Sequence, residues 1–99
     1  LARTESEVSD AAESLAAATG RFCRGYACDV ANASEIDRTF ALVRADFGEI
    51  DILVNNAGVA KGGGFESITD EEWQYDFDLK LMAAVRLSRL VLPGMKANR

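Results

Sequence analysis

The stretch Asn55-Asn56-Ala57-Gly58 places ligand-binding residue types directly after an apolar run. Residues 50–54 (Ile-Asp-Ile-Leu-Val) are mostly β-branched or apolar, which predicts a strand buried on both faces of a parallel sheet. Amide side chains can satisfy neighbouring backbone groups, and Ala57 and Gly58 allow a flat ligand to approach the main chain closely. Ligands bind at the carboxyl ends of strands in open α/β sheets, so this stretch predicts a binding edge.

The composition excludes several classes of protein. A chain of 99 residues has room for one small domain or a piece of a larger one, and its 48% hydrophobic content is that of a globular protein. A net charge of −5 argues against nucleic-acid binding. No apolar run reaches the roughly 18 residues of a membrane helix, and no secretory signal is visible.

Two cysteines, Cys23 and Cys28, with no histidine argue against a zinc site. They indicate buried free thiols in a reducing compartment, and the predicted location is cytoplasmic.

The order of the predicted elements indicates an α/β fold. Helices are predicted over residues 5–19, between Asn32 and Gly48, and over 70–97, and strands over 22–30 and 50–54. Each helix begins at a capping-box spacing, formed by Thr4 and Glu7, Asn32 and Glu35, and Thr69 and Glu72. Gly20 and Gly48 suit the positions after helix ends. Alternating strands and helices call for right-handed crossovers and a parallel sheet.

The long helix carries two apolar stripes, which predict burial on more than one side, against the sheet and against a partner subunit. Pro93 should kink or end this helix. Before it, residues 59–64 form a Gly-rich loop, for which a mobile loop beside the site is favoured over a phosphate cradle. The first stripe contains Trp73, Phe77, Leu81 and Ala84, and the second Leu79, Met82, Leu87 and Leu90.

In this order the chain resembles the short-chain dehydrogenase/reductase family over essentially its whole length. The resemblance rests on the Asn-Asn-Ala-Gly motif at 55–58, on Asp29-Val30, on Glu71-Glu72-Trp73 and on Leu92-Pro93-x-Met95. It implies that residues 1–99 are the central part of an NAD(P)-binding domain with a Rossmann-type, doubly wound parallel sheet. The family's Gly-rich turn would then precede Leu1, and its catalytic Tyr-x-x-x-Lys pair would follow Arg99.

The resemblance implies a set of cofactor contacts: Arg3, Asp29, Val30, Asn56, Ala57 and Gly58. Asp29 and Val30 would hold the adenine. Arg3 stands where many relatives carry a basic residue that can pair with the extra phosphate of NADP. NAD-dependent relatives usually have an acid one residue earlier, and that position is Ala2 here. The alternative for Arg3 is an exposed side chain at a helix start.

Lys80 departs from the family pattern. The family commonly has Asn at this place, where it holds a water molecule of the proton relay. Lysine offers three donors and no acceptor, so it cannot reproduce the role of an amide. Two interpretations stay open: an ion pair with Asp76 one helical turn earlier, or a catalytic Lys80 that replaces the relay or contacts substrate.

The function that the resemblance implies is NAD(P)-dependent oxidoreduction. Hydride would move between nicotinamide, with NADP preferred over NAD, and a small-molecule carbonyl or alcohol. The implied assembly is a homodimer or homotetramer formed through the helix at 70–97, with no nucleic acid or membrane partner. The alternative is a non-catalytic protein of the same fold that binds nucleotide or a partner, and Lys80 is the feature that favours it.

Overall fold

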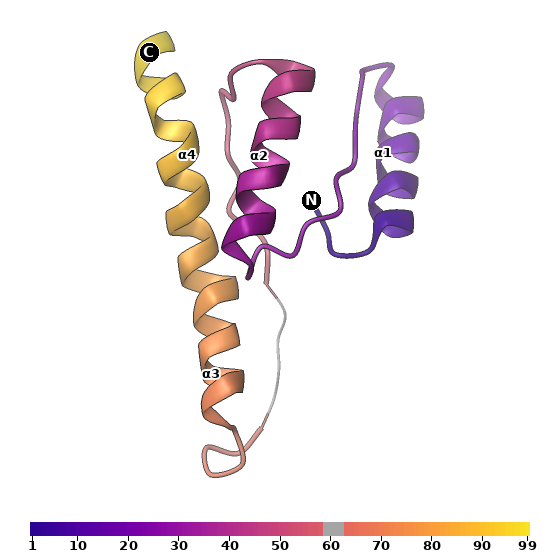
Figure 1. Ribbon diagram of the computed structural model, residues 1–99. Coiled ribbons are helices and arrows are strands. Elements are labelled where there is room, and N and C mark those ends of the chain that lie inside the picture. The colour runs from indigo at the N-terminus through magenta and orange to yellow at the C-terminus, as the bar shows by residue number, and fades with distance from the viewer. Residues whose placement is uncertain (59–62) are drawn as a thin grey trace.

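The computed structural model describes residues 1–58 and 63–99, and it consists of helices joined by extended segments (Figure 1). The first two helices are α1 (Glu5–Thr19) and α2 (Ala33–Phe47). A long helical rod then runs through α3 (Asp70–Phe77), a π-helical turn (Asp78–Met82) and α4 (Ala83–Asn98). The α4 part of the rod packs beside α2, and α1 stands at the other end of the molecule.

The bounds of α1 confirm the predicted helix at 5–19. Gly20 ends it in the left-handed conformation at φ 66°, with its N–H donated to the carbonyl of Ala16. Thr4 is the N-cap residue, but its side chain makes no capping hydrogen bond, so the predicted capping box with Glu7 is wrong. The Thr4 carbonyl instead accepts a backbone hydrogen bond from Val8 at 3.1 Å, which closes the first turn.

The second helix is capped by a side chain, as predicted. Asn32 accepts hydrogen bonds from the backbone N–H groups of Ser34 and Glu35. The Glu35 carboxylate does not return to the cap as a capping box requires; it accepts the backbone N–H of Asp29 at 3.2 Å. Gly48 ends α2 at φ 80°.

The rod confirms the long helix predicted over 70–97 and corrects two details. Thr69 caps it by accepting the N–H of Glu72 at 3.2 Å. Pro93 does not end the helix, because α4 runs on to Asn98. A proline removes one backbone hydrogen bond, and burial of Val91 on the same helix, at 5% exposure, helps to hold the segment in place. The π-helical turn was not predicted.

The Gly-rich loop lies partly outside the described residues, since positions 59–62 are not among them. Within its described part, Gly64 accepts a backbone hydrogen bond from Ser67 at 2.9 Å, which makes a turn before α3. Neither prediction for this loop, the mobile loop or the phosphate cradle, is tested.

The predicted strands are only partly formed. Among the described residues a single parallel bridge joins Ala2 to Ala27, and the N–H of Cys28 donates to the Ala2 carbonyl at 2.9 Å. Residues 50–54 have no regular secondary structure, and Ile52 and Val54 are 81% and 76% exposed. The predicted burial of this strand on both faces is therefore wrong for the described residues. A strand needs a neighbouring backbone to satisfy its N–H and C=O groups, and within residues 1–58 and 63–99 no ladder forms along 50–54.

The core forms where residues 28–30, α2 and the rod meet. Its buried members are Cys28, Val30, Ile36, Leu79 and Ala83, and Ala31, Tyr75, Leu87 and Leu90 pack against it.

The two stripes of the rod have different surroundings. Leu79, Leu87 and Leu90 of the second stripe pack into or against this core. Trp73, Phe77 and Leu81 of the first stripe remain 43–53% exposed.

The two cysteines also differ from one another. Both are free thiols, as predicted, but Cys23 is half-buried and only Cys28 is buried. In the part of the chain that the structure describes, no helix is both long and apolar enough to cross a membrane.

Tyr26 ties the segment before the core to the end of α2. Its hydroxyl donates to Asp46 at 2.5 Å, and Arg24 lies 3.2 Å from the same carboxylate oxygen. Partial burial, and then the hydrogen bond and charge of Asp46, raise the pKa of Tyr26 to about 12.

This raised pKa predicts a loss of stability in alkali. The folded state holds the Tyr26 proton more tightly than the unfolded state, so the stabilisation is complete below about pH 10 and is lost as pH rises toward about 12. In urea unfolding of the full-length protein, Tyr26→Phe should remove part of the decrease in unfolding free energy over this range. Tyr75→Phe is the matched control. An alkaline decrease as steep in Tyr26→Phe as in wild type would contradict the assignment.

Candidate functional site

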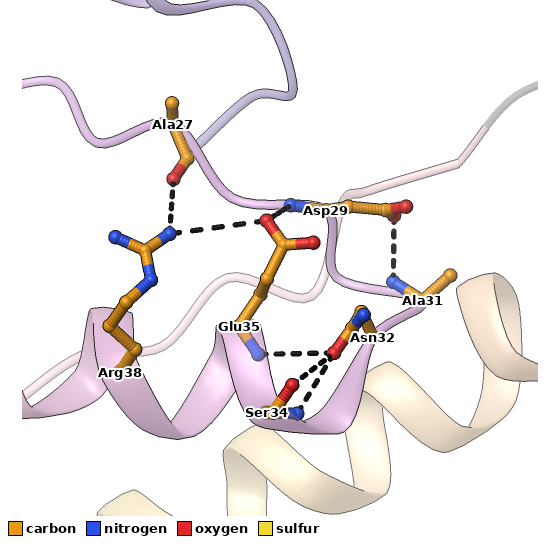
Figure 2. A network of polar contacts seen from close by, with 7 residues as sticks. All are labelled: Ala27, Asp29, Ala31, Asn32, Ser34, Glu35 and Arg38. Atoms are coloured by element: carbon orange, nitrogen blue, oxygen red, sulfur yellow. Dashed lines mark hydrogen bonds and ion pairs between the residues drawn. The ribbon is translucent and has the colours of Figure 1, made fainter.

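The turn between residue 28 and α2 is held by a network of polar contacts (Figure 2). One carboxylate oxygen of Asp29 accepts the backbone N–H of Ala31 at 3.0 Å, and the backbone N–H of Asp29 donates to Glu35 at 3.2 Å. Figure 2 shows the Asp29 carboxylate pointing away from Glu35. In the described part of the chain its second oxygen, Oδ2, has no hydrogen bond, so it can bind a ligand.

Arg38 reinforces this turn from α2. Its Nη2 donates to the carbonyl of Ala27 at 3.3 Å and lies 3.9 Å from Oε1 of Glu35 (Figure 2). Both side chains are partly exposed, so the ion pair itself adds little stability. The two side chains instead fix the geometry of the turn, because Arg38 bonds to the backbone of Ala27 and Glu35 bonds to the backbone of Asp29, on either side of Cys28.

A cavity of about 310 Å³ opens beside this turn. Its volume is at the lower end for small-molecule sites, which span about 300–1,000 Å³. Three segments that are distant in sequence meet around it, at 1–4, 28–30 and 56–58. The structure thus brings together all six predicted cofactor contacts: Arg3, Asp29, Val30, Asn56, Ala57 and Gly58.

The strand-end motif leaves space for a ligand. A Cβ atom built on Gly58 would meet nothing within 4 Å, so no other described part of the chain fills the space above its backbone. Asn55 instead faces the rod, where its Nδ2 donates to the Ser88 hydroxyl at 3.5 Å. This contact anchors the end of the extended segment to α4.

Arg3 is exposed and lies in the segment before α1. Its Nη1 donates to the phenolic oxygen of Tyr75 at 3.2 Å, across a sequence separation of 72 residues. Arg3 therefore lines the cavity and also contacts α3, while its side chain stays exposed as the alternative expects. Its role in binding phosphate stays a prediction.

Lys80 lies in the π-helical turn and borders a second cavity, of about 460 Å³. Its Nζ is 3.2 Å from Asp76 Oδ2, and the lysine side chain is 50% exposed. The same cavity is lined by Asn55, Asn56 and Ala57. The predicted ion pair with Asp76 is thus present, and Lys80 also borders the cavity at the strand-end motif; its catalytic role stays a prediction.

Sequence reasoning missed several residues that line the smaller cavity. Leu79 is 6% exposed and lines both cavities, but the sequence placed it only in an apolar stripe. Besides Leu79, the missed lining residues of the smaller cavity are Leu1, Ala2, Thr4, Glu7 and Cys28. Tyr75 does not line this cavity but contacts Arg3, and it was missed because nothing local in the sequence connects the two residues.

The larger cavity is mainly apolar and lies between α2, the rod and residues 50–57. Thr39 lines it from α2 and is only 2% exposed, and its hydroxyl has no hydrogen-bond partner in the described residues. A buried hydroxyl without a partner costs free energy. This wall of the cavity is therefore suited to a further polar contact.

Comparison with known proteins gives consistent results. The family model described as short chain dehydrogenase matches residues 1–99. The chain is 39% identical to a D-beta-hydroxybutyrate dehydrogenase of Cupriavidus necator, covering 88% of this chain and 34% of the relative. It is 36% identical to a 3-oxoacyl-[acyl-carrier-protein] reductase of Escherichia coli, covering 77% of this chain and 31% of the relative. The chain thus spans about a third of the length of these curated relatives.

Among solved structures, L-sorbose reductase from Gluconobacter frateurii, complexed with NADPH and L-sorbose, is similar to this chain throughout. The TM-score is 0.91 and the sequence identity 41%, with 97% of this chain and 36% of that chain covered.

Proposed function

The chain belongs to the short-chain dehydrogenase family, and we propose that the protein is an NAD(P)-dependent oxidoreductase. It transfers hydride between nicotinamide, with NADP preferred, and a carbonyl or alcohol group of a small molecule. The observation that carries this proposal is the cavity of about 310 Å³ in which all six predicted cofactor contacts meet.

The fold that this function requires is a Rossmann-type, doubly wound parallel sheet, of which residues 1–99 form the central part. The Ala2–Ala27 bridge is a first parallel pairing. The exposed Ile52 and Val54, the apolar cavity and the unpartnered Thr39 hydroxyl favour a further strand between residues 1–4 and 50–57. The doubly wound strand order 3-2-1-4 has a strand at that place. Because the chain spans only about a third of the length of the curated relatives, we propose that the added strand, the Gly-rich turn and the Tyr-x-x-x-Lys pair lie in sequence outside these 99 residues.

The chain's own residues bind the adenosine half of the cofactor. Asp29 accepts hydrogen bonds through its unengaged carboxylate oxygen, and Val30 forms an apolar wall beside it. Asn56, Ala57 and Gly58 bring bare backbone to the cavity, and Arg3 binds the extra phosphate of NADP. When bound, the cofactor supplies the reactive hydride.

A test of the whole proposal uses the full-length protein with NADPH and NADH. Binding of a nicotinamide nucleotide, together with its oxidation by a panel of small aldehydes and ketones, would support an oxidoreductase. Binding without turnover of any carbonyl or alcohol would favour the second candidate, a non-catalytic nucleotide-binding protein. The feature that favours this candidate is Lys80, which stands where the family commonly has Asn. Absence of nucleotide binding would refute both.

The assembly that we propose is a homodimer or homotetramer formed through the rod. Trp73, Phe77 and Leu81 repeat every four residues along α3 and the π turn, and they stay exposed while the opposite face packs on the core. An exposed apolar stripe of this kind suits a symmetric contact with a second copy. Free thiols at Cys23 and Cys28 support the proposed cytoplasmic location.

Light scattering tests this assembly. Leu81→Asp places a charge in the stripe and should convert the full-length protein to monomers, because an unpaired buried charge is costly. Leu42→Asp is the matched control, since Leu42 is similarly exposed but lies on α2. A wild-type protein that is monomeric at micromolar concentration would contradict the proposal.

The role of Arg3 is tested by cofactor affinity. Arg3→Ala removes a charge-assisted contact of about 1.5–3 kcal/mol, so the dissociation constant for NADPH should rise roughly ten- to a hundredfold. The affinity for NADH should change little. Arg21→Ala, another exposed arginine, is the control. Equal losses for the two nucleotides would remove Arg3 from the phosphate site.

The role of Lys80 is tested by turnover. We propose that Lys80 acts in the proton relay, because it borders the cavity at the strand-end motif, and π-helical turns often occur at functional sites. Lys80→Ala should lower kcat about a hundredfold, the usual scale for general acid–base catalysis, while Lys80→Asn should recover part of that loss.

Asp76→Ala is the control for Lys80, since it removes the ion pair and keeps the lysine. If kcat stays within about twofold of wild type in both Lys80 variants, the residue serves only the ion pair, whose contribution to stability is well under about 1 kcal/mol.

A further inference from the structure

Tyr75 occupies an unusual position relative to the cavity of about 310 Å³. Its ring packs against the buried cluster of Cys28, Val30, Ile36, Leu79 and Ala83. Leu79, one helical turn later on the same rod, lines the cavity itself. The phenol is therefore held by the core, and its hydroxyl accepts a hydrogen bond from Arg3 at 3.2 Å.

The partner of Arg3 is neutral, which distinguishes it from four other arginines. Arg24, Arg38, Arg44 and Arg86 each lie within 4 Å of a carboxylate. Among the described residues Arg3 has no such partner. A phenol orients the guanidinium without cancelling its charge, whereas a carboxylate would compete with an incoming anion.

The hydrogen bond to Tyr75 also leaves the Nε and Nη2 edge of the guanidinium available for an anion. Only Nη1 contacts Tyr75. The Nε and Nη2 donors point along a second edge of the planar group, and two parallel N–H donors match two oxygens of a phosphate monoester.

We propose that Tyr75 is a specificity-determining residue, which positions Arg3 for the ribose phosphate that distinguishes NADP from NAD. This inference rests on the proposed function and deepens it. Tyr75 acts through Arg3 and is a positioning residue. A side chain as long as arginine loses considerable freedom when it is immobilised on a ligand, and Tyr75 removes part of that freedom before the cofactor arrives.

The experiment measures dissociation constants of NADPH and NADH, with 2′,5′-ADP and 5′-AMP as fragment probes, for the full-length protein. Tyr75→Phe keeps the ring and removes only the hydroxyl. It should weaken NADPH and 2′,5′-ADP about three- to tenfold, the scale of one immobilised side chain, and leave NADH and 5′-AMP within about twofold. In an Arg3→Ala background the same change should have no further effect.

Tyr26→Phe is the matched control, because the hydroxyl that it removes bonds to Asp46 and not to Arg3. Three results would overturn the inference: no change in Tyr75→Phe, equal losses for both nucleotides, or the same loss with and without Arg3. If Arg3→Ala is selective for NADPH while Tyr75→Phe is silent, only the role of Tyr75 fails. If Arg3→Ala weakens both nucleotides equally, Arg3 is not at the phosphate site and the inference fails with it, while the oxidoreductase proposal stands. If neither nucleotide binds, the proposed function and the inference both fail.

Discussion

The site depends on the contact between Val30, Ile36 and Leu79. These side chains are 5%, 1% and 6% exposed, and they join the turn after residue 28 to α2 and to the rod. Full burial of one such side chain contributes about 1.5–3 kcal/mol. Val30 and Leu79 also line both cavities. The walls of the site are therefore part of the core, and its geometry is as rigid as the packing beneath it.

The smaller cavity has more acidic than basic side chains in its lining. Glu7 and Asp29 are its acidic lining residues, and Arg3 is the one cation among the described residues that line it. The chain as a whole carries a net charge of −5. An anionic ligand must therefore find its compensation at Arg3, because the rest of the field repels it. This imbalance makes the orientation of one guanidinium important, and it explains why a neutral partner such as Tyr75 suits that guanidinium better than a carboxylate does.

The parts of the structure that the sequence predicts well are those set by neighbouring residues. The bounds of α1, the Asn32 and Thr69 caps and the terminating Gly20 and Gly48 all follow from local rules. The sequence also predicted that Arg3, Asp29 and Gly58 lie close together. That prediction came from the family resemblance, which assigns all three residues to one cofactor site. Other contacts between residues far apart in the sequence could not be predicted. A ladder along 50–54 needs another backbone, and the Arg3–Tyr75 contact joins residues with no shared pattern. At Pro93 the local rule allows either a kink or a helix end, and only the helix end is wrong, because α4 runs on to Asn98.

The π-helical turn affects which residues of the rod face the core. Tyr75, Leu79, Ala83 and Leu87 pack into or against one cluster at steps of four residues. An α-helix turns once per 3.6 residues, so each step of four overshoots by about 40°, and three steps would carry the last residue about 120° away from the first. A π turn holds more residues per turn, so the turn at 78–82 takes up part of this drift and keeps both ends of the series on the core. Lys80 lies within this turn and borders the larger cavity, and Tyr75 lies in α3 just before the turn and contacts Arg3. The two side chains on which the chemistry and the cofactor preference are proposed to depend thus lie in or next to one local change in helix geometry.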